Sequence, residues 1–256
     1  MRPKLENASL LLTLLADLFF LWVIYHYALG GAETALYLLT HFGLLPWLLL
    51  AMVLFLLLYR SDYRTDLPLF LAGCALGYWG EWWGTTRGVW TYWNGAAPPD
   101  YLPPLWGIGL LTVYRLSSFL WPMLDRPLPR WFERLIAASF LLLPFLAFAW
   151  SSPRLAAVEW QGRLDGHFYA GLATGMGLVL WRFNLRRAFP LYGCGMLLGG
   201  LYEYLGTSSH EWTYITGEVP PFWIIPLWGL AAVAMHKLAS QVSELLMKKL
   251  SVQPPL

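Results

Sequence analysis

Two stretches of the chain, 122 residues apart, align with each other without a gap. Residues 64–116 fall on residues 186–238, and 20 of the 53 aligned positions are identical. The identities include Glu81 with Glu203 and a Trp-Thr-Tyr triplet nine residues after each glutamate. A repeat constrains the fold more than any other feature, because both copies must adopt the same local structure. We predict two related units, residues 1–123 and residues 124–256.

Long apolar stretches indicate the fold class. The chain is 58% hydrophobic and 12% charged, whereas soluble domains carry roughly 25% charged residues. Stretches near the length of about 20 residues that crosses a bilayer predict eight spans, near residues 8–28, 35–58, 66–84, 103–122, 132–150, 166–182, 188–206 and 222–240. The predicted fold is an all-α, polytopic membrane bundle of about eight transmembrane helices. Since each copy holds an even number of helices, the two four-helix repeats should run parallel.

The distribution of basic residues supports this helix count. With eight spans, the side that holds both termini carries twelve Lys and Arg residues, and the other side carries only Arg87, Arg154 and Arg163. The positive-inside rule then predicts a multi-pass protein of the plasma or inner membrane with both termini in the cytoplasm. Residues 242–250 have an amphipathic pattern, which predicts a cytoplasmic surface tail after the last span.

Other sequence features narrow the expected ligands. Cys74 and Cys194 lie singly in apolar stretches, and no Cys/His cluster occurs, so neither a metal site nor a cofactor is predicted. No basic run interleaved with aromatic residues indicates nucleic acid. The expected partners are membrane lipids and a lipophilic small molecule, and the sequence leaves the oligomeric state open.

The repeated glutamates are the strongest candidates for chemistry. Glu81 and Glu203 fall near the outer ends of their helices, and Thr85 and Thr207 follow one turn later on the same helix face. A carboxyl group at such depth must be paired, protonated or open to a wet cavity. Burial penalises its charged form, which makes it a candidate proton donor. Alternatively, each glutamate only accepts hydrogen bonds from the Trp and Tyr of the following loop.

Further polar and aromatic residues are candidates at the same site. Asp17 lies near the middle of the first span, and an intramembrane acid suggests a functional role by default. Arg87, in the first outer loop, could bind a polar head group or remain solvated. The aromatic residues could anchor the membrane interface or wall a cavity that stabilises a cation. The candidates for substrate binding are Thr85, Thr207, Arg87, Trp90, Tyr92, Trp212 and Tyr214.

One stretch carries a family resemblance. Residues 81–92, Glu-Trp-Trp-Gly-Thr-Thr-Arg-Gly-Val-Trp-Thr-Tyr, followed by Pro-Pro-Leu-Trp, resemble a motif of membrane carotenoid-biosynthesis proteins, which include the carotenoid hydratases. The family pattern is Glu-x-x-Gly-x-x-x-Gly-x-x-x-Tyr. Here Trp90 stands in place of an aromatic–glycine pair, and the second copy has His210 in place of Gly88. The resemblance implies that Glu81 and Glu203 donate protons to an alkene and that Asp17 or His41 positions water.

Three functions remain open at this point. The leading interpretation is a membrane enzyme, hydratase-like, cyclase-like or an isomerase, that uses acid–base chemistry on an isoprenoid or carotenoid substrate at the outer membrane face. A second is a lipid or small-solute binding or transport protein, since repeat interfaces often hold such sites. A third is a structural subunit of a membrane complex.

Overall fold

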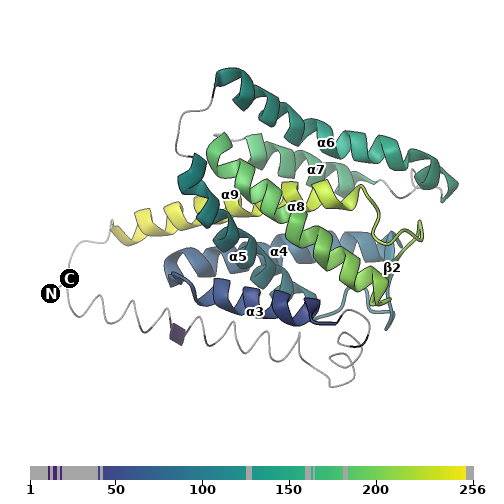
Figure 1. Ribbon diagram of the computed structural model, residues 1–256, viewed down its shortest axis with the longest axis horizontal. Helices are drawn as coiled ribbons and strands as arrows, with labels where there is room; N and C mark the ends of the chain where they lie inside the picture. Colours follow the sequence, from purple (N-terminus) through teal and green to yellow (C-terminus); the bar gives the residue numbers. More distant parts are fainter. Residues whose placement is uncertain are drawn as a thin grey trace.

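The computed structural model describes residues 43–124, 129–158, 165–180 and 184–251, together with Leu11, Leu14, Leu15, Leu18, Thr40 and Arg163. Helices dominate this part of the chain, which confirms the all-α class. The elements, shown in Figure 1, are α3 (Leu45–Leu58), α4 (Tyr63–Thr86), β1 (Trp90–Tyr92), α5 (Leu102–Leu120), the 3-10 helix η2 (Trp121–Leu124), α6 (Arg130–Ala157), α7 (Gly166–Leu180), α8 (Leu185–Ser208), β2 (Trp212–Tyr214) and α9 (Ile224–Ser251).

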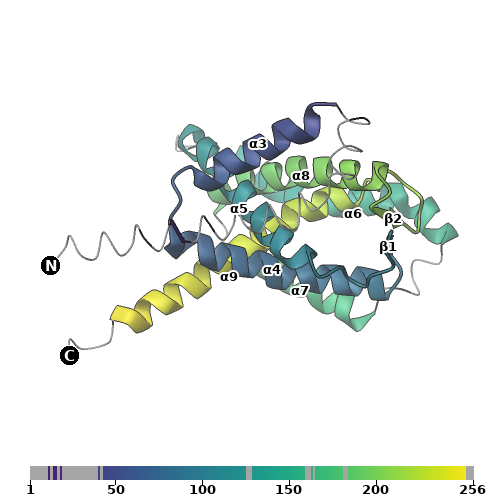
Figure 2. The ribbon, with the colours of Figure 1, turned by 90° about the horizontal axis from the view of Figure 1, so that it is seen from below.

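The long helices lie roughly lengthwise in one bundle, with β1 and β2 at one end (Figures 1 and 2). We call this the sheet end, and the opposite end, where α4, α6 and α8 begin, the base end. Ion pairs link the helices at both ends: Arg186 at the start of α8 lies 3.9 Å from Glu133 in α6. At the sheet end, Arg154 of α6 pairs with Glu218, which follows β2.

The two repeat copies begin with equivalent helix caps. The side chain of Asp62 accepts a hydrogen bond from the backbone N–H of Arg64 at the start of α4. Asn184, 122 residues later, accepts one from Arg187 at the start of α8. Asp and Asn at this position satisfy N–H groups that lack a partner within the helix. The caps therefore fix the same helix start in both copies.

The two strands pair with each other in a register that reveals a local twofold axis. β1 and β2 are antiparallel, and Trp90 pairs with Tyr214, Thr91 with Thr213, and Tyr92 with Trp212. The repeat equates Trp90 with Trp212 and Tyr92 with Tyr214. Each residue thus faces the equivalent of its partner, as a twofold axis between the two threonines requires. The sheet joins the outer loops of the two copies.

Glycines allow the helices of each copy to pack closely. A side chain on Gly73 would come within 2.8 Å of the backbone of Gly107, where α4 crosses α5. In the second copy, a side chain on Gly195 of α8 would come within 2.9 Å of Ala232 Cβ and 3.0 Å of the backbone oxygen of Trp228 in α9. Such close approach leaves no room for a Cβ atom, so these positions require glycine. The copies meet in one core that contains equivalent buried side chains, among them Leu69, Leu111, Leu191 and Val233.

One helix among the described residues is long and apolar enough to cross a membrane. By length, apolar composition and low charge, Arg130–Ser151 of α6 is a candidate membrane span. α3 and α7 have 14 and 15 residues, and α4 and α8 combine charged residues with many Gly, Trp and Tyr residues. Length and composition thus single out one candidate span, rather than eight, in the described part of the chain.

The helix positions otherwise follow the apolar stretches. α4 to α9 overlap the last six predicted spans, and α3 covers the end of the second. The first predicted span falls almost entirely outside the described residues, as do Asp17 and His41. The predicted tail does not begin with a break: α9 continues as one helix to Ser251. No glycine or proline interrupts residues 230–251, which explains the continuous helix.

Candidate functional site

The carboxyl group of Glu81 is buried and receives three hydrogen bonds. Trp90 Nε1 and Tyr92 Oη donate to Oε2 at 2.9 and 2.8 Å. Trp106 Nε1 donates to Oε1 at 3.0 Å. The first two donors come from β1 and the third from α5, so the glutamate fastens both elements to α4. Each of these N–H and O–H groups would lose a partner without the carboxyl group.

The second copy repeats this arrangement atom for atom. Trp212 Nε1 and Tyr214 Oη donate to Glu203 Oε2 at 3.0 and 2.9 Å. Trp228 Nε1 donates to Oε1 at 2.9 Å. The expectation that each glutamate accepts hydrogen bonds from the Trp and Tyr of the following loop is confirmed. The third donor, on α5 or α9, was not expected. Its signal was available, since both copies place a Trp 25 residues after the glutamate.

A helical stripe of glycines makes room for the indole rings. Gly77 and Gly84 lie on the same face of α4 as Glu81, one turn before and one turn after it. A Cβ atom on Gly77 would lie 2.2 Å from the ring of Trp106, and one on Gly84 would lie 2.0 Å from the ring of Trp90. Gly199 and Gly206 have the same relation to Trp228 and Trp212. The spacing Gly-x3-Glu-x2-Gly therefore leaves space for one indole ring on each side of the carboxyl group.

The two glutamate clusters also contact each other. The rings of Trp106 and Trp228 stack with centroids 4.1 Å apart and planes 10° apart. Trp90 packs against Tyr214 at 5.6 Å, and Tyr92 against Trp212 at 5.9 Å. Every donor to one glutamate therefore touches a donor to the other. The aromatic rings form a single interface between the two copies.

A cavity of about 130 Å³ lies inside this interface. Both glutamates line it, so the structure brings the two predicted acidic residues together. We call it the glutamate cavity and define it by its principal lining residues, which are Gly80, Glu81, Trp90, Tyr92, Trp106, Tyr202, Glu203, Trp212, Tyr214 and Trp228. Of the predicted substrate-binding residues, the Trp and Tyr of both strands belong to this set.

The hydrogen bonds leave one acceptor position on each glutamate. An ionised carboxylate offers about four lone-pair positions, and the described residues fill two on Oε2 and one on Oε1. The same count holds for Glu203. Each Oε1 can therefore take one more hydrogen-bond donor or carry a proton. Two carboxylates that line one small cavity disfavour each other's charge, which promotes a state with a proton or a donor between them.

The two predicted threonines serve the helix backbone. Thr85 Oγ1 donates to the carbonyl oxygen of Glu81 at 2.7 Å, and Thr207 Oγ1 donates to that of Glu203 at 2.6 Å. Such bonds to the carbonyl four residues earlier are a common role of threonine in helices. Neither threonine is among the residues that line the glutamate cavity. Their repeated position reflects this helical bond.

Arg87 pairs with an acid instead of facing the cavity. Its guanidinium donates to Asp165, which also accepts hydrogen bonds from Trp83 Nε1 at 3.1 Å and from the backbone N–H of Phe168 at 3.0 Å. Desolvation opposes the charge on Asp165, but the Phe168 N–H, His167, Trp83 and Arg87 outweigh it, and the pKa of Asp165 lies well below its usual value. The cluster fastens the α4–β1 turn to the start of α7.

His167 and His210 lie near the sheet end, and neither lines the glutamate cavity. His167 lies 3.2 Å from Asp165. His210 occupies the left-handed turn after α8 with φ +60°, the conformation that Gly88 adopts after α4. No group of three or more His, Cys, Asp or Glu residues that could hold a metal ion occurs among the described residues.

A buried ion pair at the base end was not predicted. Arg115 Nη2 lies 2.5 Å from Asp66 Oδ1, and the two residues are 5% and 2% exposed. The pair joins the start of α4 to the last turns of α5. The equivalent residues in the second copy are Lys237 and Ala188, so the pair breaks the twofold relation. The sequence did contain a clue to this pair. An acid at the start of one helix and a base at the end of the next come close together when the two helices pack antiparallel.

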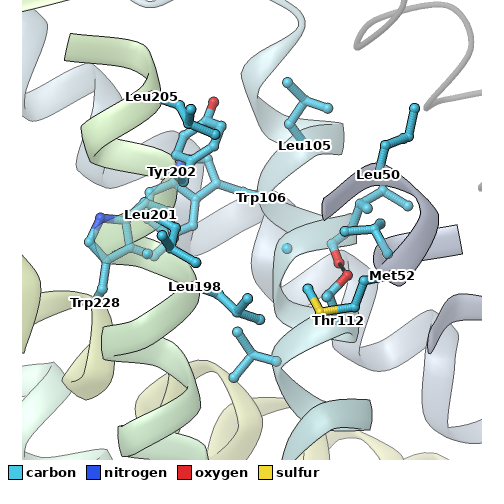
Figure 3. A pocket seen from close by; sticks show the side chains of 15 residues that line it. Leu50, Met52, Leu105, Trp106, Thr112, Leu198, Leu201, Tyr202, Leu205 and Trp228 are labelled. Atoms are coloured by element: carbon cyan, nitrogen blue, oxygen red, sulfur yellow. Dashed lines mark hydrogen bonds between the residues drawn. The ribbon is translucent and has the colours of Figure 1, made fainter. Parts of the chain in front are cut away.

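Two apolar grooves flank the glutamate cavity at equivalent positions. The first, of about 250 Å³, lies between α3, α5 and α8; we call it the α3 groove, and Figure 3 shows its lining, with Tyr202, Trp106 and Trp228 close together. The second, of about 240 Å³, lies between α7, α9 and α4; we call it the α7 groove. Residues of the two grooves match under the repeat: Leu50 with Leu172, Ile108 with Leu230 and Leu205 with Trp83.

The fold and the site define a helical protein with a duplicated, buried carboxyl pair in an aromatic cavity. Comparisons of the chain with protein-family models, with curated proteins and with solved structures find no match.

Proposed function

We propose that the chain is a multi-pass membrane protein built from two parallel four-helix units. Large apolar side chains exposed on the described surface support this, since soluble proteins rarely expose extended apolar patches. Trp131 and Trp150 of α6 are 67% and 75% exposed. Other exposed apolar residues lie on α3, α4 and α8, namely Leu48, Phe55, Leu71 and Leu197.

The basic residues support a cytoplasmic base end. Each of the helices α4, α6 and α8 has two arginines at or beside its start: Arg60, Arg64, Arg130, Arg134, Arg186 and Arg187. Accordingly, a cysteine in place of Asp100 at the sheet end should react with an impermeant maleimide on intact cells. A cysteine in place of Glu244 at the base end should react only after permeabilisation. The reverse pattern, or equal labelling, would contradict this topology.

We further propose that the glutamate cavity carries out acid–base chemistry on the polar or unsaturated end of a lipophilic substrate. The observation that carries the proposal is that Glu81 and Glu203 line one cavity, each with one open acceptor position on Oε1. One carboxyl group can hold a proton while the other accepts one. A pair of carboxyl groups with different protonation is a common acid–base arrangement.

The proposed reaction is a protonation of a carbon–carbon double bond. The proton passes from one carboxyl oxygen to an alkene carbon, and the π electrons form the new C–H bond, which leaves a carbocation. The faces of the surrounding indole rings stabilise such a cation. Water then adds and gives its proton to a glutamate, or a neighbouring C–H bond loses its proton and a double bond reforms. Hydration, isomerisation and cyclisation share this first step.

The test is product formation in cells that synthesise an acyclic carotenoid with a terminal hydroxyl group. Expression of the wild-type chain should convert the pigment to a product that differs by one water or has the same mass, separated by chromatography. Glu81→Gln and Glu203→Gln should each lower the yield at least tenfold per amount of folded protein, and Glu244→Gln should leave it unchanged. Unchanged yield in both cavity variants, or no conversion by the wild-type chain, would refute the acid–base proposal.

One observation favours a second function, ligand binding without chemistry. Three hydrogen-bond donors on each carboxyl group stabilise its ionised form, which works against proton donation. In that case the glutamates hold the sheet and the aromatic walls in place, and a bound lipophilic molecule leaves unchanged. Recovery of such a molecule, chemically intact, from the purified wild-type protein in cells that show no conversion would support binding alone.

A further inference from the structure

One position next to the glutamates breaks the twofold relation of the site. Gly80 immediately precedes Glu81, and its equivalent, Tyr202, immediately precedes Glu203. Both residues line the glutamate cavity. The first copy thus has no side chain where the second copy has a large ring. The hydrogen bonds to the two glutamates are the same in both copies, so this difference changes the access to the cavity and leaves the glutamate contacts alike.

Tyr202 forms a wall between the glutamate cavity and the α3 groove. Its ring packs against Trp212 with centroids 5.1 Å apart and against the edge of Trp228 at 5.9 Å. It lines both the cavity and the α3 groove, and Figure 3 shows it beside Trp228 and Trp106. A ring held between two indoles fills the space through which a ligand in the α3 groove would reach Glu203.

The equivalent space on the other side is open. A Cβ atom built on Gly80 would meet no atom within 4 Å. Gly80 lines both the glutamate cavity and the α7 groove, and the two share Trp90, Ile224, Leu227 and Ala231 as further lining residues. The cavity and the α7 groove are therefore neighbours, and no side chain separates them at Gly80.

From this asymmetry we propose that the α7 groove, and not the α3 groove, holds the apolar tail of the ligand, whose head reaches the glutamates past Gly80. The inference rests on the proposed function for the role of the glutamates. The volumes of the groove and the cavity together lie at the low end of the range of roughly 300–1,000 Å³ for ligand pockets. Gly175 on α7 leaves that wall of the groove open, since a Cβ atom there would meet no atom within 4 Å.

The lining defines the chemistry of the ligand. The α7 groove has apolar and aromatic walls, including Trp83, Phe168 and Trp223, which suit a flat, unsaturated chain. The free acceptor position on each Oε1 suits a head group that donates a hydrogen bond. The ligand class is thus a long unsaturated lipid with a hydroxyl or ammonium head.

Retinol is a suitable probe, because it has a polyene tail and a hydroxyl head and accepts energy from excited tryptophan. Binding to the full chain in detergent is measured as tryptophan-to-retinol energy transfer. Gly80→Tyr, which copies the second repeat, and Gly175→Leu, which fills open space in the α7 groove, should each weaken binding at least tenfold. Gly109→Leu is the matched control, since it fills equally open space in the α3 groove and should leave the affinity unchanged.

Two further arms identify the head group and the route. Retinyl methyl ether, which lacks a donor, should bind at least tenfold more weakly than retinol, whereas retinylamine should bind at least as well as retinol. The double variant Gly80→Tyr/Tyr202→Gly moves the open side to the α3 groove, so Gly109→Leu should now weaken binding and Gly175→Leu should not.

The inference is overturned if Gly175→Leu and Gly109→Leu weaken binding equally, if Gly80→Tyr has no effect, or if wild-type protein does not bind retinol. These outcomes are separate from the fate of the acid–base proposal. Pigment conversion that depends on Glu81 and Glu203 but not on Gly80 or Gly175 would refute the route alone. Retinol binding that depends on Gly80 without any conversion would refute the chemistry alone.

Discussion

The two repeat copies agree in the contacts of their glutamates at the sheet end and differ in their buried charges at the base end. Around Glu81 and Glu203, three equivalent donors bind equivalent oxygen atoms. At the base end, the first copy has the buried pair of Asp66 and Arg115, and the second has Ala188 and Lys237 at these positions. The rings that bind the glutamates also pack against the equivalent rings of the other copy, whereas the pair of Asp66 and Arg115 lies within one copy. Likeness at the sheet end therefore serves the interface between the copies.

The largest expected loss of stability follows from removing the ion pair at the base end of the first copy. Asp66→Ala leaves the guanidinium of Arg115 buried without its carboxylate partner, and removal of one partner of a buried pair costs about 3–5 kcal/mol. The free energy of unfolding in detergent, from denaturant titration, should fall by this amount. The double variant Asp66→Ala/Arg115→Leu removes both charges, so no buried charge is left without a partner. It should recover most of the loss. A loss below about 1 kcal/mol for the single variant would contradict the assigned role of the pair.

The next effect compares the two glutamates. In Glu81→Gln an amide N–H₂ replaces one carboxyl oxygen, so at least one buried donor from Trp90, Tyr92 or Trp106 loses its acceptor, at a cost of about 1–3 kcal/mol. Glu203→Gln should cost the same within about 0.5 kcal/mol, because its donors are equivalent. Denaturant titration of both variants, with the exposed Glu244→Gln as control, checks this. A difference above about 2 kcal/mol would show that the copies are unequal at the site.

A smaller effect distinguishes the turns that lead into the strands. Gly88 and His210 both have φ near +60°, a conformation that costs a residue with a side chain about 1 kcal/mol relative to glycine. Gly88→Ala should therefore lower the free energy of unfolding by about that amount, whereas His210→Ala should change it by less than about 0.5 kcal/mol. Equal losses in the two variants would contradict the account of the turns.

The smallest effect concerns the surface cluster of Arg87 and Asp165, which joins the two copies. The pKa of Asp165 is lowered in the folded protein, so its stabilising contribution is complete above the unfolded-state pKa of about 4 and is lost as the pH falls through the folded-state value. Thermal stability of the wild type and Asp165→Asn should differ by a constant amount between pH 6 and 8 and converge below about pH 4. A stability difference that grows as the pH falls would contradict the lowered pKa of Asp165.

The sequence predicted the helices better than their contacts. Apolar stretches located α4 to α9, and the alternative that the loop Trp and Tyr bind each glutamate was confirmed. The pairing of β1 with β2 was missed, because a three-residue strand has no detectable pattern until its partner is known. The pair of Asp66 with Arg115 was missed because residues 49 positions apart meet only after α4 and α5 pack together.

The candidate site shows the same division. The repeat identified Glu81 and Glu203, and the structure places both on one cavity. Thr85 and Thr207 were assigned to the substrate because they share the helix face of the glutamates, but their hydroxyls bind backbone carbonyls. Tyr202 could not be found from the repeat identities, because Gly80 stands at the equivalent position. The proposed access route depends on this difference between the copies.

The most direct test of a shared glutamate site is a double-mutant cycle of Glu81→Gln and Glu203→Gln, read as the free energy of unfolding in detergent. Residues that act within one site show a coupling energy of about 0.5–3 kcal/mol, whereas independent sites add within about 0.3–0.5 kcal/mol. The shared cavity predicts that the double variant loses more stability than the sum of the single variants, because each single substitution relieves the repulsion between the two carboxylates and the double variant can relieve it only once. Additive losses would show two separate clusters and contradict the account.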